Sequence, residues 1–473
     1  MPLSLPDIDP DKITTLTEAK EAIRLLMNSF ENLVQLYIKS EEKIERLEAE
    51  IARLKGQPKK PEFTGKKKEP ATASVKKLLK EKGVWHKTSK QGRIPVDREA
   101  QLPEVEECVC GSHEFKTLRR TGRIVQGLII KRDNILYRGR KKQCVSCGKI
   151  YKSIEPEDIR GTTFNSSIRT LISYLKFVTR VTEPLLYRMV NGFGILISMG
   201  QINAIALANS TKLKPAYQHL RTVGIAKSAY NQTDATGSKR KLKSGKIINQ
   251  YVQVVSNKLL SVFVITRKYT AETVNQVLGR QGRKKPLVSD DGSQNGDSCI
   301  CRTKQLCWVH EIRRYWKLFP FFTGQRYWQR RILLQWRRFY HLAKHYGESP
   351  PEIRQKQRKK IAVMFDLITS QETGYDLLDK QLRITAKKKD RLLTFLDHPY
   401  LPIHNNQCEL DLRSFVIIRK ISGGTKSLAG DNSLVRHLSL IQTAQKQRLD
   451  IYRILDGLLT GKLSPAILTA NII

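Results

Sequence analysis

The stretch YNQTDATGSK (residues 230–239) decides the fold, because it begins a series of three strand-like runs. The next two runs are NQYVQVVSN (249–257) and KLLSVFVITRK (258–268), and turn-like breaks separate the three. Short β-rich segments between turn residues are typical of consecutive strands. The sequence therefore predicts three antiparallel strands, with Asp234 at the polar exit of the first.

The residues after these strands alternate between helix and strand patterns. TAETVNQVLGR (270–280) predicts a helix, whereas KPLVSD (285–290) and KQLCWVH (304–310) predict short buried strands. Three antiparallel strands, a helix, a strand, a helix and a strand is the order of a ribonuclease-H-like α/β core. We place the first part of this core at residues 223–310.

Helical patterns fill the rest of the chain after this core. Residues 311–400 are strongly helical, as an insertion would be, and residues 401–473 give a catalytic helix and a helical tail. The insertion interleaves arginines with aromatic residues that include Trp316, Trp328 and Trp336. Aromatic stripes on helices usually form a core, but the arginines also suit a surface that grips DNA backbone.

The predicted core offers three carboxylates for a two-metal phosphoryl-transfer site. Such a site needs acids that converge from separate elements to hold two Mg²⁺ (or Mn²⁺) ions. Asp234 lies on the first strand, Asp290 ends the fourth, and Glu409 begins a later helix, with Arg413 one turn further on. These residues are the predicted catalytic and Mg²⁺-binding groups.

Two aspartates compete for the second position in PLVSDDGSQNGD (286–297). Successive side chains of a strand point to opposite faces, so only one of the pair can face Asp234. Asp290 directly follows the buried run and takes the ligand position. Asp291 then points to the other side or caps a following helix.

The composition predicts a polyanionic partner. The 473-residue chain has 85 Lys and Arg against 44 Asp and Glu, a formal net charge of +41. Lysines and arginines that face phosphates release counterions, so double-stranded DNA is the expected partner. We expect no membrane span and no signal peptide, and clustered cysteines that favour a reducing cytoplasm.

The N-terminal residues predict a coiled coil in a multidomain chain. Apolar side chains recur with spacing 3-4-3-4 through residues 15–55, which we assign as a coiled-coil helix in domain 1–55. A helix of this length favours a homo-oligomer, and the alternative is a helix packed on its own globular domain. Residues 56–100 follow as a basic linker.

Two cysteine pairs predict a zinc-ribbon-like module at residues 101–157. Cys108 and Cys110 form one knuckle, Cys144 and Cys147 form the second, and a glycine follows each. Four thiolates suit structural, tetrahedral Zn²⁺. The first knuckle is C-x-C where C-x-x-C is commoner, so free thiols or a relic of a lost site are the alternative, and His113 could replace one cysteine.

Residues 158–222 predict a helical DNA-binding segment. Three helical stretches with short turns resemble a helix-turn-helix, in which the helix near residues 198–209 would enter the major groove. Many helical linkers share this pattern.

The longer motifs together resemble the bacterial DDE transposases of the insertion sequence 66 family. NNQCELDLRSFVIIRKISGGTKSLAGDNSLVRHLSLIQTAQKQRLDIYRIL looks like the closing signature of that family, and QTDATG, LVSDDGSQ and CWVHEIRRYWKL match other blocks in the same order. The resemblance covers most of residues 105–460. It implies that the protein excises and inserts a mobile DNA element. The expected location is the bacterial cytoplasm, at the nucleoid, and other proteins encoded by the element are expected as accessory partners.

The resemblance also implies roles for single residues. Asp234, Asp290 and Glu409 would be the metal-binding triad. His310 and Arg313 match a His-x-x-Arg pair that contacts the scissile phosphate. Three further cations would bind DNA backbone beside them: Arg413, Lys420 and Lys426. Cys299 and Cys301 are an unexpected pair next to the second acid.

Two other functions compete with an active transposase. A catalytically silent or domesticated relative would bind element ends without cutting, and a resolvase-type nuclease would cut without joining. The three intact acids argue against the first. The coiled coil and the zinc module are not expected of the second.

Overall fold

The computed structural model describes residues 8–9, 13–54, 96–101, 106–116, 124–128, 130–156, 160–242, 244–292, 295 and 299–472. The chain divides into two units. One contains Met1–Leu47 and Leu136–Ile473, and the other contains Glu48–Ile135. The sheet and the helices around it belong to the first unit.

A five-stranded mixed sheet with the order β5-β4-β3-β6-β7 forms the centre of this unit. The pairs β3–β4 and β4–β5 are antiparallel, whereas β3–β6 and β6–β7 are parallel. The three predicted antiparallel strands and the two short buried strands are therefore confirmed. Their bounds are Asn231–Lys241 (β3), Ile247–Ser256 (β4), Ser261–Thr266 (β5), Leu287–Ser289 (β6) and Lys304–Leu306 (β7).

The region after β6 differs from the prediction at β7. The helix predicted between the two short strands falls partly outside the described residues, and no described residue there lies in an α-helix. The predicted strand at 304–310 ends at Leu306, and helix α8 (Trp308–Trp316) begins after Cys307. The backbone N–H of Trp308 donates to the carbonyl of Ile403, so it no longer continues the β7 ladder.

Helix α14 (Leu428–Lys446) covers the exposed edge strand β5. Ser439 Oγ accepts from Phe263 N at 2.9 Å, and Thr443 Oγ1 accepts from Ser261 N at 3.1 Å. These bonds satisfy edge N–H groups that would otherwise offer a template for another strand. The other helices around the sheet are α5 (Lys214–His219), α6 (Ile225–Lys227), α7 (Ala271–Gly282), α13 (Asn406–Ser422) and α15 (Ile451–Thr460).

Three helices before the core pack around a small apolar cluster of their own. They are α2 (Ser166–Ser173), α3 (Glu183–Gly192) and α4 (Met199–Lys212), and the cluster includes Ile172, Leu186 and Ile202. Helix α4 is the predicted major-groove helix. Its exposed side presents Gln201 and Asn203, which can form hydrogen bonds to base edges. Groove entry itself stays a prediction.

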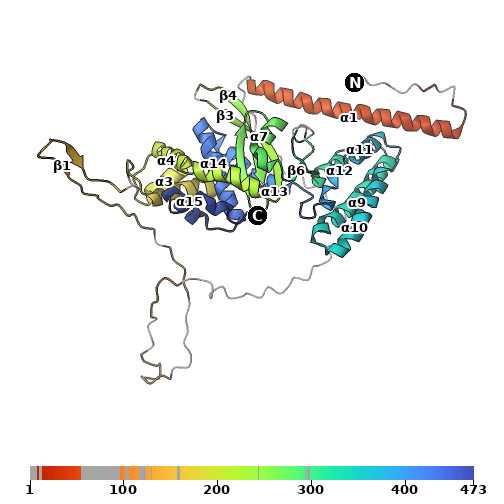
Figure 1. Ribbon diagram of the computed structural model, residues 1–473. Coiled ribbons are helices and arrows are strands. Elements are labelled where there is room, and N and C mark those ends of the chain that lie inside the picture. The colour runs from red at the N-terminus through yellow and green to blue at the C-terminus, as the bar shows by residue number, and fades with distance from the viewer. Residues whose placement is uncertain are drawn as a thin grey trace. The chain divides into compact units, whose positions relative to one another are not determined.

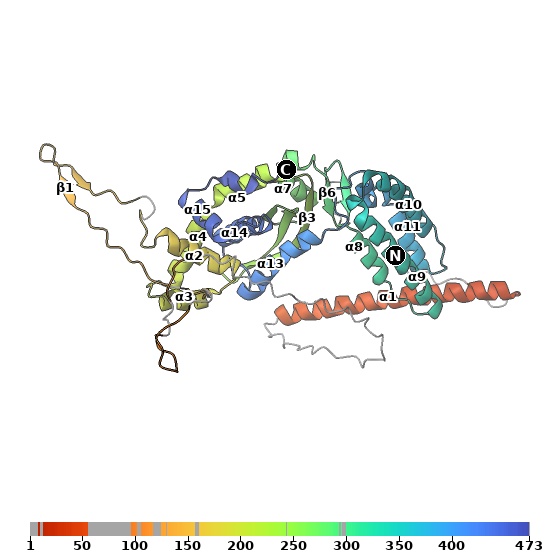
Figure 2. The ribbon, with the colours of Figure 1, turned by 90° about the horizontal axis from the view of Figure 1, so that it is seen from below.

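The insertion forms a helical bundle with a second apolar core. It contains α9 (Thr323–His345), α10 (Pro351–Thr369), α11 (Asp376–Ala386) and α12 (Lys389–Leu392), and the sheet lies between this bundle and helices α4, α14 and α15 (Figures 1 and 2). Trp336 is fully buried against Trp308 and Phe339, so the expectation of an aromatic core is confirmed at that position. Trp316 is exposed.

Helix α1 (Leu16–Leu54) confirms the long N-terminal helix and shows how it packs. One side contacts the insertion: Asn28 Nδ2 donates to the carbonyl of Gly374 at 3.3 Å, and Tyr375 Oη donates to buried Glu31. The apolar heptad positions stay largely exposed on this helix, Leu33 at 51% and Leu47 at 53%. The alternative of packing on its own domain is thus observed, and it includes the heptad position Phe30, whose ring contacts Phe321 edge to face at a centroid distance of 5.3 Å.

A two-stranded hairpin of β1 (Lys141–Gln143) and β2 (Ile150–Lys152) carries the second cysteine pair. The basic linker predicted for residues 56–100 lies almost wholly outside the described residues. No helix in the described part of the chain is long and apolar enough to cross a membrane.

Candidate active site

The strand register brings Asp234 and Asp290 to neighbouring positions. Strand β3 pairs with β6 in parallel, Asn231 opposite Leu287 and Gln232 opposite Val288. If this register is continued by two residues along each segment, Asp234 lies opposite Asp290. Because the two strands run in this register, both carboxylates lie level with the carboxyl end of β6, while β3 continues to Lys241.

Asp234 is largely buried and accepts a hydrogen bond at Oδ1 from Ala235 N at 2.8 Å. Burial and, to a smaller extent, the nearby charges of Asp290 and Glu409 raise the pKa of Asp234 to about 6, against the lowering effect of that hydrogen bond. A carboxyl that is buried near two other carboxyls binds its proton tightly. A cation at this position would relieve the repulsion.

The two adjacent aspartates have different surroundings. Asp290 Oδ1 accepts from Asn295 Nδ2 at 2.7 Å and from Gly292 N at 3.3 Å. Asp291 Oδ2 instead lies 2.6 Å from Lys388 Nζ and 2.9 Å from Arg314 Nη2, both on the insertion side. Asp291 is therefore paired with two protein cations, whereas the bonds of Asp290 among the described residues come from neutral donors beside Asp234.

Glu409 lies in the first turn of α13, and this turn is anchored to the sheet. Asn405 Nδ2 donates to the carbonyl of Thr233 at 3.0 Å, next to Asp234 in the chain. Asn405 N contacts Cys307 Sγ at 3.2 Å, just before α8. These bonds hold the beginning of α13 against β3 and bring Glu409 close enough to act on the pKa of Asp234.

His310 on α8 faces Glu409. Its Nε2 lies 3.6 Å from Glu409 Oε1, and both side chains are a little over a quarter exposed. His310 Nδ1 and Glu409 Oε1 are themselves buried, and no hydrogen bond joins either atom to a described residue. Buried polar atoms with free hydrogen-bonding capacity are typical of a site that receives a ligand or an ion.

A buried ion pair that the sequence did not reveal supports α13. Lys446 Nζ on α14 lies 2.6 Å from Asp411 Oδ2, two residues after Glu409. The same Asp411 oxygen accepts from Ser256 and Ser261 on β4 and β5. No local pattern marks this contact, since Asp411 and Lys446 are 35 residues apart.

Carboxylate oxygens are the donors that Mg²⁺ and Mn²⁺ prefer, so the chemistry of Asp234, Asp290 and Glu409 fits these ions. Among the described residues, no three His, Cys, Asp or Glu side chains lie close enough together to form a metal-binding group. Mg²⁺ is usually held by one or two carboxylates together with water and substrate phosphates.

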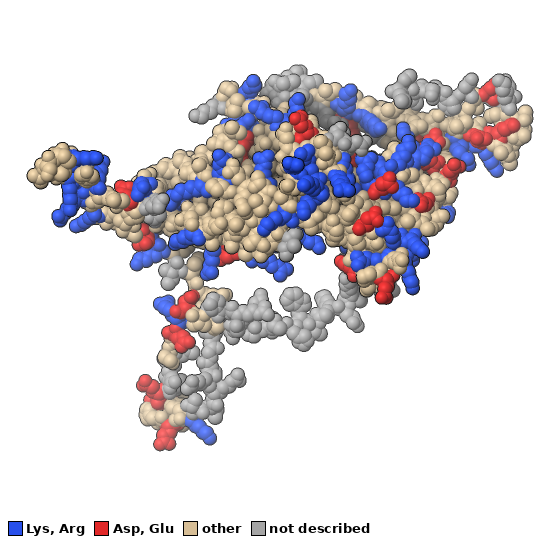
Figure 3. Space-filling view, in the orientation of Figure 1, with Lys and Arg blue, Asp and Glu red and all other residues tan. Residues whose placement is uncertain are grey.

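The predicted DNA contacts lie at the surface on two helices and a loop. Arg313, Arg413, Lys420 and Lys426 are all exposed. Gly424, with φ +105°, allows the loop before Lys426 to approach β3, where an added Cβ would lie 2.5 Å from the carbonyl of Lys239. Figure 3 shows Lys and Arg spread over the face it draws, with fewer Asp and Glu among them.

Each predicted zinc knuckle is a local turn. Gly111 N donates to the carbonyl of Cys108 at 2.7 Å and Gly148 N to that of Cys144 at 2.9 Å, and both glycines have positive φ. The hydrogen bonds around these turns lower the pKa values of Cys108 and Cys144. The two pairs belong to different units, so a shared four-thiolate site stays a prediction.

Cys299 and Cys301 are buried, with their sulfurs 3.8 Å apart in the apolar core beside the sheet.

The mixed sheet with carboxylates from β3, β6 and α13 defines an α/β protein with an acidic centre. A model of the transposase IS66 family matches residues 161–433, more than half of the 473-residue chain. The chain therefore belongs to the transposase IS66 family, and this confirms the resemblance. The family points to a DNA-processing enzyme.

One curated relative is a protein described as uncharacterized protein y4jO, from Sinorhizobium fredii (strain NBRC 101917 / NGR234). It is 38% identical to this chain over 170 residues. The match covers 36% of this chain and 50% of the relative, so this chain spans about half the length of the curated relative it matches.

Proposed function

We propose that this protein is a transposase that cuts and joins DNA at the ends of an insertion sequence by two-metal phosphoryl transfer. The observation that carries the proposal is the shared neighbourhood of Asp234, Asp290 and Glu409, in which burial and two acidic neighbours raise the pKa of Asp234. The sheet order and the position of α13 support a ribonuclease-H-like core with a helical insertion.

In this proposal the three carboxylates hold Mg²⁺ or Mn²⁺, which when bound would stabilise the attacking and leaving oxygens of the phosphodiester. Asp234 must lose its proton to act as a ligand. His310 would donate a hydrogen bond to the scissile phosphate from its place beside Glu409, and Arg313 would bind the same phosphate through its guanidinium. Arg413, Lys420 and Lys426 would bind the flanking DNA backbone.

We also infer two supporting modules. Helix α1 would form a coiled coil with a second copy through its exposed heptad seam. Cys108, Cys110, Cys144 and Cys147 would bind structural Zn²⁺, a proposal that rests on their spacing and on the two glycine turns. Zinc analysis of the purified protein and of a Cys144→Ser variant tests the second inference, because a metal-free wild type would exclude it.

One experiment separates the transposase from the two alternatives. Labelled element ends, a target plasmid and Mn²⁺ are incubated with wild type, Glu409→Gln or Asp234→Asn. Strand-transfer products from wild type alone support the proposal. Binding without cleavage by every protein would indicate the domesticated relative, and cleavage without joining would indicate the resolvase-type nuclease.

A further inference from the structure

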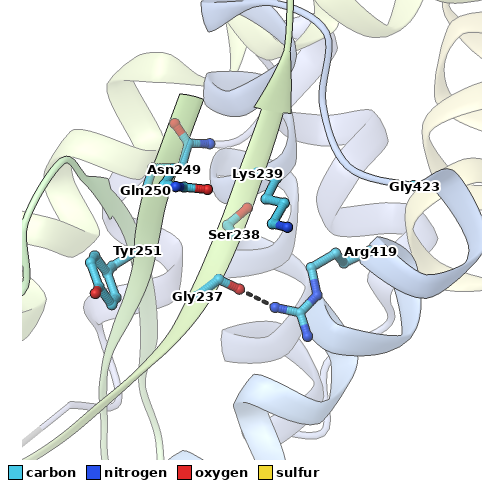
Figure 4. Close-up of a pocket in the computed structure, with 8 residues that line it drawn as sticks. All are labelled: Gly237, Ser238, Lys239, Asn249, Gln250, Tyr251, Arg419 and Gly423. Atoms are coloured by element: carbon cyan, nitrogen blue, oxygen red, sulfur yellow. Dashed lines mark hydrogen bonds between the residues drawn. The ribbon is translucent and has the colours of Figure 1, made fainter. Parts of the chain in front are cut away.

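We propose that a pocket along β3, beyond Asp234, binds the phosphate backbone of the DNA strand that leads away from the catalytic carboxylates. The pocket has a volume of about 550 Å³ and lies between the β3–β4 hairpin and the later turns of α13 (Figure 4). The inference rests on the proposed function, since it assigns a part of the same DNA substrate to residues that have had no role so far.

The charged side chains that line the pocket favour an anionic ligand. Its wall contains two cations, Lys239 and Arg419, and no carboxylate. Arg419 donates to the carbonyl of Gly237, a neutral acceptor (Figure 4). Within the described part of the chain, neither cation forms an ion pair. Both charges are thus available to a phosphate, and a guanidinium can bind its oxygens in a fork.

Gly237 leaves room for the backbone of a ligand. A Cβ added at this position would meet no heavy atom within 4 Å, so the space beside the strand is open. Tyr251 lies opposite Gly237 in the antiparallel pair, and Asn249 lies opposite Lys239. Residues opposite each other project to the same face of a sheet. An amide, an ammonium group and an aromatic ring therefore share this face, a combination that suits a phosphate with its sugar.

The distance along β3 fits a strand that passes the catalytic centre. Gly237 follows Asp234 by three residues, which at ~3.3 Å per residue is about 10 Å. Phosphates of one DNA strand are spaced at ~3.4 Å along the helix axis. Side chains alternate along a strand, so Asp234 and Gly237 project to opposite faces of β3. A DNA backbone that runs from Asp234 along β3 for about three nucleotides would reach Arg419, which donates to the Gly237 carbonyl.

The test measures DNA binding and not cutting. The full-length chain carrying Asp234→Asn is titrated with a fluorescein-labelled 30-base-pair duplex at several KCl concentrations. Each lost phosphate contact lowers the slope of log K against log salt by about one. We expect Arg419→Ala in this background to weaken binding by about 3- to 10-fold at low salt and to lower the slope by about one.

Arg453→Ala is the matched control, since Arg453 is an exposed arginine on α15 that lies beside Asp450. It should leave the slope unchanged. An unchanged slope in Arg419→Ala, or an equal fall in Arg453→Ala, would overturn the proposal. Inorganic phosphate is added as a competitor: if it displaces the duplex only from proteins with Arg419 intact, the pocket is a phosphate site.

Gly237→Ile is a second variant that leaves both cations in place. It fills the open space with a side chain that strands favour, so we expect its melting temperature to match that of the parent protein. Its DNA binding should weaken as in Arg419→Ala. If Gly237→Ile folds normally and binds the duplex as tightly as the parent protein does, the inference is wrong. These readouts stay interpretable even if the wild-type protein joins no DNA, in which case the proposed function alone would fail.

Discussion

His310 on α8 and Glu409 on α13 face each other, with Nε2 of the histidine 3.6 Å from Oε1 of the glutamate. Helix α8 follows β7 at one edge of the sheet, and α13 packs on β3 and β4. The contact therefore joins the insertion side of the sheet to the helix that carries the third acid. Because His310 lies beside a carboxylate that would hold a metal ion, it can donate to a phosphate bound there.

The first prediction follows from this position. We expect His310→Gln to bind element ends as wild type does and to cleave them on the order of 100-fold more slowly, since removal of one hydrogen-bond donor from a charged transition state costs about this much. Single-turnover cleavage of labelled ends in Mn²⁺ gives the rate, and a filter-binding titration gives the affinity. A wild-type cleavage rate would remove His310 from the site.

The second prediction concerns the proton on Asp234. Its pKa is about 6 in the folded protein against an ordinary value of 3.8. The folded state binds this proton more tightly than the unfolded chain does, so the stability that it contributes is complete below pH 3.8 and is lost as the pH rises through 6. Asp234→Asn cannot ionise and should be more stable than wild type at pH 7.5 in EDTA, by roughly 3 kcal/mol.

Urea unfolding at pH 4.5 and pH 7.5, with EDTA or with Mn²⁺, measures this difference. The difference in the free energy of unfolding between Asp234→Asn and wild type should be smaller at pH 4.5, because wild-type Asp234 is mostly protonated there. Mn²⁺ should stabilise wild type more than the variant at pH 7.5, because an ion that binds only the folded state raises its stability. Equal effects of Mn²⁺ on both proteins would count against Asp234 as a ligand.

The third prediction separates Asp290 from Asp291. Asp290→Asn should abolish cleavage with little change in stability. Asp291→Asn should keep part of the activity but lower the free energy of unfolding by about 2 kcal/mol, because it removes the charged partner of Lys388 and Arg314. Cleavage assays and urea unfolding of both variants check this. The reverse pattern would mean that the metal-binding register is shifted by one residue.

The sequence predicted the parts of this site that depend on local patterns. Runs of strand residues located β3 and β6, and the order of these runs placed Asp234 and Asp290 on neighbouring strands. The start of α8 was not predictable from CWVH, because the bond from Trp308 N to Ile403 depends on a residue almost a hundred positions away. The contact between Glu31 and Tyr375, 344 residues apart, was invisible for the same reason.

The fourth prediction concerns the buried pair that holds α13. Lys446→Met should destabilise the protein by about 3–5 kcal/mol, since it leaves the Asp411 carboxylate buried without its cation. The double variant Asp411→Asn with Lys446→Met should lose less than the sum of the two single changes. Urea unfolding of the three variants gives the coupling energy. Additive losses would show that the two side chains act independently.

The last prediction tests the seam of α1. Leu33 and Leu47 are half exposed, whereas Glu31 and Asn28 are buried toward the insertion, so the helix docks on its own bundle and still offers an apolar stripe. We expect Leu33→Lys with Leu47→Lys to convert a wild-type oligomer to a monomer, because lysines at heptad positions place charge in the interface between two helices. Light scattering after size exclusion measures the mass. Glu41→Lys, at an exposed position outside the seam, is the control and should keep the wild-type mass. A monomeric wild type, or an oligomer that survives both leucine substitutions, would rule out the coiled coil and leave α1 as a helix that packs only on its own insertion.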